Sequence, residues 1–291
     1  MPESKKRSSP PLRGRGAGAH RGSRPRRTRP PAPAGPLLAV DIGNSEVVVG
    51  LFHGDAVHGF WRLTSAPATA DEIGLRLDAL AYGRAGGHER VGSVRASVLC
   101  SVVPPLTPMW MEALARFTGR PPVEVTTHSA RSLAVRYRDR SAVGPDRLAN
   151  AVAVRALFGT PAIVVDLGTA TTFDCVSRNG AYLGGVIAPG LGTSAEELFR
   201  RAARLARVEL RRPERAVGRT TEESLRAGII WGHAGQVDAL VRRLALEMKG
   251  TPHVIATGGY APLVVPECET INRVDEALTL KGMKILWEEN S

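Results

Sequence analysis

Two short segments each place an acid, a glycine and hydroxyl side chains directly after an apolar run. In "LLAVDIGNS" the run ends at Asp41, and in "IVVDLGTATT" it ends at Asp166. Glycine allows the backbone to approach a ligand closely, and successive N–H and hydroxyl groups can donate to phosphate oxygens. The acid can hold a cation, directly or through water. These segments therefore predict two turns that handle phosphate and a cation.

A single turn of this kind would be explained equally well as an ordinary tight turn before a strand. The repetition favours the functional interpretation, since Asp41 and Asp166 are 125 residues apart, about one domain length, and a strand-like run follows each of them. The sequence has no GxxxxGK[ST] motif, so a nucleotide would need a different phosphate-binding loop. The segment "ATGG" at 256–259 could form a platform for the nucleoside. We predict an internal duplication, with two α/β lobes facing each other across a cleft.

The rest of the sequence alternates between strand-like and helix-like segments, as expected for an α/β fold. The patterns predict strands within 94–104 and 253–259, and helices at 107–119, 145–159, 195–210 and 221–250 (with an interruption allowed), and the segment at 278–290 closes the chain. The predicted domains are a disordered tail at 1–35, an N-terminal lobe at 36–150 and a C-terminal lobe at 151–291.

The basic character of the chain is confined to its first residues. The formal net charge is +11, but residues 1–34 hold ten Lys or Arg and one acid, which leaves the remainder near neutral. This segment is rich in Arg, Pro, Gly and Ser and has little to bury, so we expect it to be disordered. A dispensable extension is favoured over a weak nucleic-acid tether. No nucleic-acid partner is expected for the folded body.

Other features indicate a cytoplasmic protein. No run of 18 apolar residues exists, so no membrane span is predicted, and the apolar stretch after Arg29 is too short for a signal peptide. Cys100, Cys175 and Cys268 are far apart in the sequence, as expected of reduced thiols. We expect most of them to be buried in the core as small apolar residues. The histidines show no ligand spacing, so we interpret them as surface or loop residues that form no zinc site.

The ordered set of motifs resembles the type III pantothenate kinase family, within the superfamily of actin and sugar kinases, along residues 37–290. The segments that carry the resemblance are "DIGNSEVVVGLF", "SVVPPLTPMW", "VGPDRLANAVA", "VVDLGTATTFDCV", "GGVIAPGLGTSAEELF", "TTEESLRAG", "ATGGYA" and "LTLKGMKILWEEN". The resemblance implies a homodimeric kinase with two duplicated ribonuclease H-like (actin-like ATPase) lobes around a central cleft. The implied reaction is ATP-dependent phosphorylation of the primary hydroxyl of pantothenate, the first step toward coenzyme A, with Mg²⁺ and K⁺ or NH₄⁺ as cations.

The resemblance also implies roles for individual residues. It places ATP on Asp41, Ile42, Gly43, Asn44, Ser45, Glu46, Val47, Val48 and Thr169. It implies Asp146 as the general base and Asp166 as the ligand of the monovalent cation. It places pantothenate on Tyr137, Gly144, Pro145, Asp146, Arg147 and, from the neighbouring subunit, Thr221. The chain departs from the family pattern at Ser45, usually Thr, at Pro145, usually Ala, and at Tyr260 after the Gly-Gly pair.

The residues themselves leave alternatives for these roles. A carboxylate in the first turn of a helix is kept ionised by the helix dipole, and a loose phosphoryl-transfer transition state needs only a weak base, so Asp146 suits the role. Asp is also common there merely as a cap. Arg147 could anchor a carboxylate or amide, or be an ordinary surface arginine.

The segment from 220 onwards has two interpretations as well. Thr220 and Glu223 match a capping box, which needs no further function. Gly228, Gly232 and Gly235 form a stripe on a predicted helix, where each glycine costs roughly 1 kcal/mol relative to Ala. The stripe indicates close packing against another backbone, either of a second subunit or within the same chain.

Two rival functions remain at this point. One keeps the fold and ATP but changes the acceptor to another small hydroxylated molecule, and the combination of "GPDR" and "TTEES" argues against it. The other is a catalytically altered family member with a regulatory or accessory role. Loss of an acid turn would favour that role, and both turns are intact.

Overall fold

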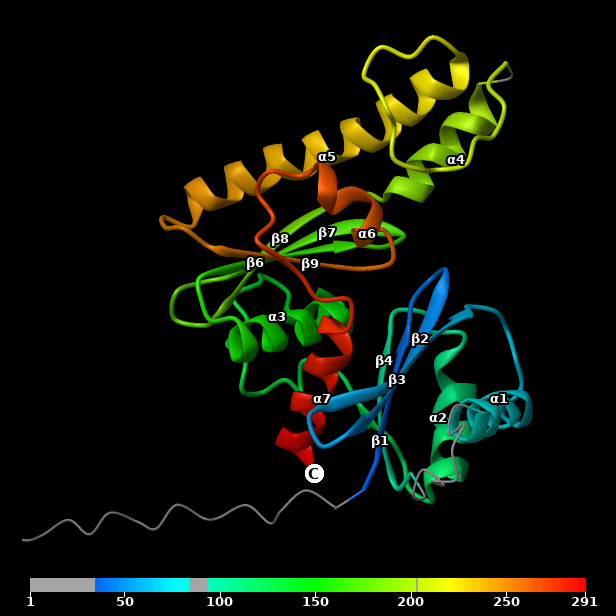
Figure 1. Ribbon diagram of the computed structural model, residues 1–291. Coiled ribbons are helices and arrows are strands. Elements are labelled where there is room, and N and C mark those ends of the chain that lie inside the picture. Colours follow the sequence, from blue (N-terminus) through cyan, green and yellow to red (C-terminus); the bar gives the residue numbers. More distant parts are fainter. Residues whose placement is uncertain (1–34, 84–93, 203) are drawn as a thin grey trace, which may run out of the picture. The chain divides into compact units, whose positions relative to one another are not determined.

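The computed structural model describes residues 35–83, 94–202 and 204–291 (Figure 1). The predicted tail at 1–35 therefore lies almost entirely outside the described residues. The rest contains two five-stranded sheets, with strand orders β3-β2-β1-β4-β5 and β10-β9-β6-β7-β8. The first sheet consists of β1 Leu37–Ile42, β2 Glu46–His53, β3 Ala56–Thr64, β4 Ala96–Ser101 and β5 Val123–Glu124. The second consists of β6 Ala162–Leu167, β7 Ala170–Val176, β8 Tyr182–Pro189, β9 His253–Thr257 and β10 Arg273–Val274.

The two sheets repeat the same pairing scheme, which confirms the predicted duplication. β1 pairs antiparallel with β2 and parallel with β4. β6 likewise pairs antiparallel with β7 and parallel with β9. Asp41 lies opposite Val48 across the first hairpin, and Asp166 lies opposite Thr172 across the second. Each acid therefore occupies the same place in its sheet, at the carboxyl end of the central strand.

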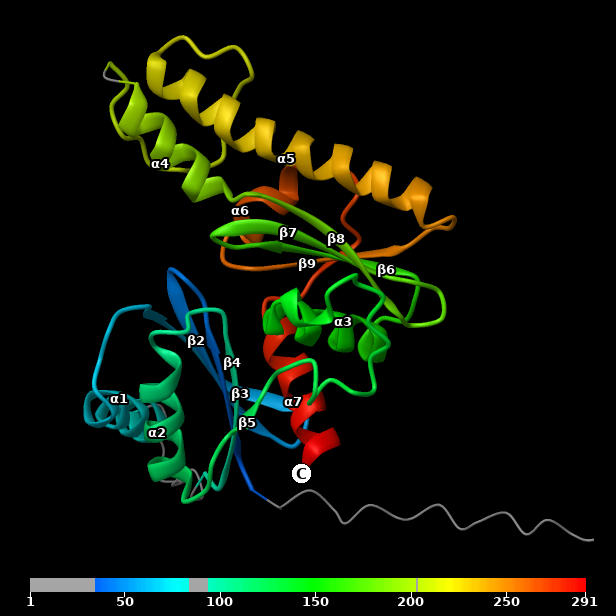
Figure 2. The same ribbon diagram turned by 180° about the vertical axis from the view of Figure 1, so that it is seen from behind.

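Helices cover both faces of each sheet (Figures 1 and 2). They are α1 Ala70–Gly83, α2 Thr107–Thr118, α3 Pro145–Leu157, α4 Leu191–Arg201, α5 Thr221–Glu247, α6 Ala261–Val264 and α7 Leu278–Asn290, with short 3₁₀ turns η1 Arg140–Ala142 and η2 Val265–Glu267. α1 and α2 pack on one face of the first sheet, while α5 and α6 pack on one face of the second. No helix in the described part of the chain is long and apolar enough to cross a bilayer.

The inner faces of the two sheets share one core with α3 and α7. Strand alternation directs Leu37 and Ala39 of β1 to this core, and it directs Ala162 and Val164 of β6 there from the other side. The intervening strand residues face the outer helices. Because burying apolar surface is the main stabilising term in folding, this shared core fixes α3 against both sheets. α3 is the helix that carries the "GPDR" segment.

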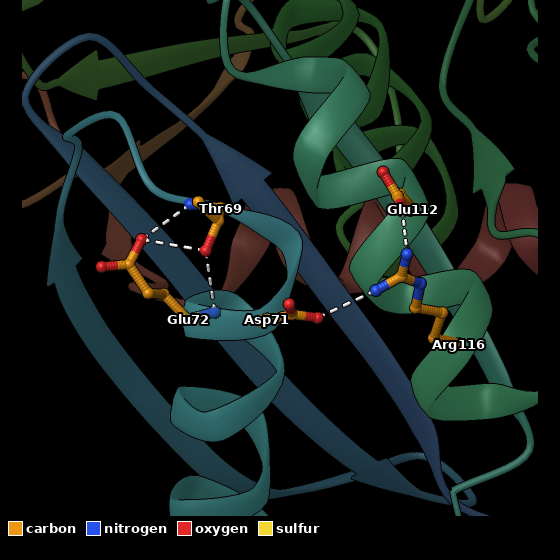
Figure 3. Close-up of polar contacts among 5 residues, drawn as sticks. All are labelled: Thr69, Asp71, Glu72, Glu112 and Arg116. Carbon is orange, nitrogen blue, oxygen red and sulfur yellow. Dashed lines mark hydrogen bonds and ion pairs between the residues drawn. The ribbon is translucent and has the colours of Figure 1, made fainter.

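Polar contacts lie at the start of α1 and between the two outer helices of the first sheet (Figure 3). Thr69 and Glu72 form a reciprocal capping box at the start of α1, with N···O distances of 2.8 and 3.2 Å. Asp71 of α1 accepts a hydrogen bond of 2.9 Å from Arg116 of α2, which is also paired with Glu112. These contacts are exposed and therefore contribute little energy, and only the pair of Asp71 with Arg116 joins α1 to α2.

The structure differs from the sequence-based expectations in two helices. α4 ends at Arg201, whereas the pattern predicted a helix to residue 210. Beyond it, Leu210 packs against the core beneath α5 and the carbonyl of Glu209 accepts a hydrogen bond from Arg226, so tertiary contacts override helix propensity there. α5 is a single uninterrupted helix of 27 residues. β3, α1, β8 and the helix α7 were not predicted.

Candidate active site

The first acid turn is closed by its own backbone. The N–H of Gly43 donates to the carbonyl of Glu46 at 2.9 Å, and a Cβ at Gly43 would lie only 3.1 Å from that oxygen. Asn44 and Ser45 are exposed at the tip, while Asp41 is half-buried at the end of β1. Ile42 and Val47 are buried and Val48 is partly buried beneath the tip. The turn thus presents polar groups on an apolar base.

The second acid turn has the same construction. The N–H of Gly168 donates to the carbonyl of Ala170 at 3.1 Å, and Thr169 is exposed at the tip. The "ATGG" segment packs directly behind it, since a Cβ at Gly258 would lie 2.6 Å from Asp166 Oδ1. Gly258 has a φ of +94°, a conformation that favours glycine. The late glycine turn therefore lies against the second acid turn, and its role as a nucleoside platform stays a prediction.

The two turns meet. The hydroxyl oxygens of Ser45 and Thr169 lie 2.8 Å apart, within hydrogen-bonding distance. Glu46, beside Ser45, pairs with Arg62 of β3 at 2.8 Å, and a Cβ at Gly259 would lie 3.4 Å from the same guanidinium. Groups from both sheets therefore converge at one place.

Asp146 occupies the first turn of α3, directly after the predicted Gly144-Pro145 pair. Its Oδ1 accepts a hydrogen bond of 2.8 Å from the backbone N–H of Arg147. A Cβ at Gly144 would lie 2.5 Å from that Oδ1, so only glycine leaves room for the side chain. Pro145 starts the helix, where its missing N–H costs nothing.

Three carboxylates share this site electrostatically. Burial raises the pKa of Asp41 to about 7 and that of Asp166 to about 6, and Asp146 is the next largest cause in both cases. Arg62 opposes both shifts, and the thiol of buried Cys100 also lowers the pKa of Asp41 by hydrogen bonding. Burial raises the pKa of Asp146 as well, the opposite of the effect expected from the helix dipole alone. The site therefore favours a ligand that brings positive charge.

Sequence reasoning missed Asn150, although a signal for it existed. Asn150 lies one helical turn after Asp146, at i+4, and therefore on the same face of α3. It is fully buried, its amide donates to Asp166 Oδ2 at 3.3 Å, and its carbonyl accepts from Thr279 of α7 at 2.8 Å. Asn150 thus ties α3 to the second acid turn.

The predicted substrate residues Tyr137 and Arg147 lie in one cluster. Arg147 is buried and pairs with buried Asp174 at 2.7 Å, and the hydroxyl of Tyr182 donates to the same carboxylate at 3.0 Å. The rings of Tyr137 and Tyr182 have centroids 6.4 Å apart, and Tyr137 is partly exposed. Arg147 is thus not the surface arginine that the sequence alone allowed. Asp174 and Tyr182 were missed because strand pairing decides their position.

Thr221 is the predicted site residue that the single chain does not bring to the cluster. It begins α5, with Thr220 as the N-cap that accepts from the N–H of Glu223 at 3.1 Å. α5 and α3 pack on opposite faces of the second sheet (Figure 1). Any contact between Thr221 and the α3 residues would have to involve another subunit.

α5 also corrects one prediction and bears on the interpretation of the glycine stripe. His233 is buried and lies 3.0 Å from the hydroxyl of Thr171, so it is not a surface or loop residue. In the glycine stripe, a Cβ at Gly228, Gly232 or Gly235 would meet nothing within 4 Å among the described residues. Close packing within the chain therefore does not explain the stripe.

Cation binding at this site would need ligands beyond the side chains. Within the described ranges, no group of three or more His, Cys, Asp or Glu is arranged to hold a metal ion alone. Carboxylate, hydroxyl and backbone oxygens of the two acid turns are hard ligands, suited to Mg²⁺ or an alkali cation completed by nucleotide or water oxygens. The free thiol of Cys175 is buried in β7, whereas that of Cys100 is buried in β4 beside the Asp41 carboxylate.

Comparison with known proteins identifies the family. A family model described as type III pantothenate kinase matches residues 37–243. The chain belongs to the type III pantothenate kinase family. The type III pantothenate kinase of Moorella thermoacetica is 45% identical over 256 residues, which cover 88% of this chain and 100% of that protein. The resemblance that the motifs indicated is thus confirmed, and with it the kinase class of enzyme.

Solved structures support the fold of the family. A Campylobacter jejuni protein described as a Baf family transcriptional activator has a TM-score of 0.56 at 20% identity, over 87% of this chain and 98% of its own. An activator of 2-hydroxyisocaproyl-CoA dehydratase from Clostridium difficile, solved with ADPNP, has a TM-score of 0.50 at 14% identity, over 88% and 96%. These likenesses confirm the two-lobed actin-like ATPase fold.

Proposed function

We propose that this protein phosphorylates the primary hydroxyl of pantothenate with ATP, giving 4′-phosphopantothenate for coenzyme A synthesis. Membership of the family supports the reaction, and the single structural observation that carries it is the meeting of Ser45 and Thr169, 2.8 Å apart. Two hydroxyl-bearing turns that converge beside three carboxylates can position a nucleotide's terminal phosphates next to an acceptor alcohol. Phosphoryl transfer depends mainly on such positioning and on charge stabilisation.

The first turn, Asp41 to Val48, and Thr169 bind the ATP phosphates in this proposal. Backbone N–H groups and the hydroxyls of Ser45 and Thr169 donate to phosphate oxygens, and Gly258 and Gly259 leave room for the nucleoside. Arg62 lies close enough to both turns to affect the pKa of Asp41 and of Asp166. Neither turn contains Lys or Arg, so Arg62 supplies positive charge that the turns lack.

Asp146 accepts the proton of the pantothenate hydroxyl. Its Oδ1 is held by the N–H of Arg147, which fixes the carboxylate at the start of α3. Gly144, Pro145, Arg147 and Tyr137 contact the rest of the acceptor. A base with a pKa somewhat above that of free Asp is better matched to this task, because general-base efficiency improves as the pKa approaches the working pH.

Two cations fit the residues present. Asp41 and Asp166 are half-buried carboxylates whose charged forms are disfavoured by burial, which is the environment that a bound cation would relieve. We assign the monovalent cation, K⁺ or NH₄⁺, to Asp166, and Mg²⁺ to ATP beside Asp41. When bound, these ions neutralise the charge on the phosphates.

We also propose a cytoplasmic homodimer in which Thr221 reaches the partner's acceptor site. The exposed glycines of α5 support this, since they leave a smooth helix face for another backbone. Gly232→Arg would place a charged side chain on that face and should shift the protein to a monomer in analytical ultracentrifugation, while Gly74→Arg on α1 should not. An unchanged dimer in Gly232→Arg would contradict this assignment. The N- and C-terminal lobes are proposed at 36–150 and 151–291.

The reaction is tested directly. Purified protein is mixed with ATP, Mg²⁺, K⁺ and pantothenate, and ADP and phosphopantothenate are quantified by mass spectrometry. Replacing K⁺ by Na⁺ should slow turnover, and NH₄⁺ should restore it. Turnover of other small hydroxylated acceptors in preference to pantothenate would favour the rival kinase. No turnover of any acceptor, with ATP bound, would favour an accessory role.

A further inference from the structure

Asp174 of β7 is a fully buried acid that none of the roles above uses. Its exposed fraction is 0%, and its Oδ1 accepts two hydrogen bonds, from Arg147 Nε at 2.7 Å and from the hydroxyl of Tyr182 at 3.0 Å. Burying a charge is costly unless it is paired and hydrogen-bonded. The pair with Arg147 meets that requirement only in part, because Asp174 Oδ2 has no partner among the described residues.

The contacts of Asp174 hold Arg147 from two sides. The guanidinium carbon lies 5.8 Å from the centre of the Tyr182 ring, so the arginine packs on that ring while Nε is bound to the carboxylate. Burial alone would lower the pKa of Arg147, and Asp174 and Tyr182 more than offset that effect. The guanidinium is therefore kept charged in a fixed orientation.

One edge of Arg147 is left without a protein acceptor. Nη2 is enclosed and has no hydrogen-bond partner in the part of the chain that the structure describes. A bidentate pair would have used Nη2 together with Asp174 Oδ2, and that second bond is absent. An unpaired buried donor carries a desolvation cost, so this edge favours an incoming acceptor oxygen.

The unpaired edge lies near Tyr137, a residue of the predicted acceptor site. A Cβ at Gly185 of β8 would come within 3.3 Å of Nη2, and a Cβ at the neighbouring Gly184 within 3.1 Å of the Tyr137 ring. Two successive glycines therefore bring the free donor and Tyr137 to the same stretch of β8. Tyr137 is the most exposed member of the cluster, so it lies between the other members and solvent.

We infer that Asp174 and Tyr182 are positioning residues that hold Arg147 with one N–H edge free for a carbonyl or carboxylate oxygen of the acceptor. This inference rests on the proposed function and adds a determinant of acceptor affinity. It separates two roles on neighbouring residues: Asp146 acts on the reacting hydroxyl, and the Asp174–Arg147 pair binds the acceptor away from it. The ATP site proposed above includes neither residue of that pair.

The test is steady-state kinetics of Asp174→Asn and Tyr182→Phe. Losing the charge at Asp174 should raise KM for pantothenate about 10- to 100-fold, as for a hydrogen bond to a charged group, and Tyr182→Phe should raise it about 3- to 10-fold. KM for ATP should stay within about 2-fold in both variants, because the interaction removed is with the acceptor alone. Tyr182→Phe keeps the ion pair, so it remains informative if Asp174→Asn folds poorly.

A matched control separates positioning from stability. Asp238 of α5 is a buried carboxylate that accepts from the N–H groups of Glu269 and Thr270, away from this cluster. Asp238→Asn should lower Tm but leave KM for pantothenate unchanged. If Asp174→Asn and Tyr182→Phe behave like Asp238→Asn, the inference is wrong.

A double-mutant cycle completes the test. If Asp174 acts through Arg147, Asp174→Asn should add little to the pantothenate KM of Arg147→Lys, whereas independent effects would multiply. Multiplied effects would overturn the inference. Absence of pantothenate turnover in the wild-type protein would instead overturn the proposed function, so the two failures are distinguishable.

Discussion

Ser45 and Thr169 are 124 residues apart in the chain, yet their hydroxyl oxygens lie 2.8 Å from each other. Each hydroxyl sits at the tip of a hairpin whose first strand ends in an acid, Asp41 in one sheet and Asp166 in the other. Two hydroxyls that satisfy each other without ligand can each turn to a phosphate oxygen when one arrives, since a hydroxyl hydrogen rotates to suit its partner. In the proposed reaction, this contact is where the duplicated halves would share the nucleotide.

Ser45→Ala should weaken ATP binding without abolishing turnover. It removes one of the two hydroxyls and leaves Thr169, so we expect KM for ATP to rise about 2- to 10-fold, in line with one neutral hydrogen bond. Ser45→Thr restores the hydroxyl and should keep the wild-type KM. Ser177→Ala, whose hydroxyl bonds within its own turn, is the control. A wild-type KM for ATP in Ser45→Ala would exclude a role for this hydroxyl.

Asp146→Asn should lower kcat about 10²- to 10⁴-fold, the range for loss of a general base, with little effect on KM for ATP. Asn retains the acceptor for the Arg147 N–H, so the start of α3 should be preserved. Asp139→Asn is a matched control, because Asp139 caps η1 by accepting from the N–H of Ser141 at 3.0 Å and lies outside the acid cluster. If both substitutions changed kcat equally, Asp146 would have no role beyond capping the start of α3.

The local parts of this site were predictable from sequence, and the parts built by strand pairing were not. Asp41, Asp166 and Asp146 each lie in a segment whose own turn or helix start determines the geometry. Arg62 and Asp174 lie in the middle of alternating strands, where the sequence shows neither the neighbouring strand nor the register. Tertiary contacts likewise decide where α4 ends.

Asp41 and Asp166 should make the ligand-free protein less stable as pH rises from about 4 to about 7. The folded pKa of Asp41 is about 7 and that of Asp166 about 6, both above the ordinary 3.8, so the folded state binds protons more tightly than the unfolded state. Their contribution to stability is therefore present below about pH 4 and is lost as pH rises through the folded pKa values.

Asp41→Asn tests the sign of this effect. The amide mimics the protonated acid, so the variant should have a higher Tm than wild type at pH 8, a smaller gain at pH 5 and no gain below about pH 4. Asp55 gives the opposite case, because its hydrogen bond to Lys284 lowers the pKa of its carboxyl. Asp55→Asn should show no gain in Tm at pH 8. A Tm for Asp41→Asn below that of wild type at pH 8 would show that the buried carboxylate is compensated in the free protein.

Gly282→Ala should destabilise the protein and impair catalysis together. A Cβ at this position of α7 would lie 2.0 Å from the carbonyl oxygen of Ala149 in α3, so the two helices would have to separate, at about 1–3 kcal/mol for overpacking. α3 carries Asp146 and Asn150, and Asn150 is held by Thr279 one turn earlier on α7. Moving α7 therefore shifts the residues that face the second acid turn.

Gly74→Ala provides the matched comparison for Gly282→Ala, because it is also a helical glycine but its Cβ would meet nothing within 4 Å among the described residues. Helix propensity alone predicts a gain of about 1 kcal/mol there. Urea unfolding and kcat measured on both variants check the argument. Since propensity favours alanine at both positions, a loss confined to Gly282→Ala can come only from the contact between α7 and α3. A gain in stability for both variants would mean that α3 can move away from α7 at little cost.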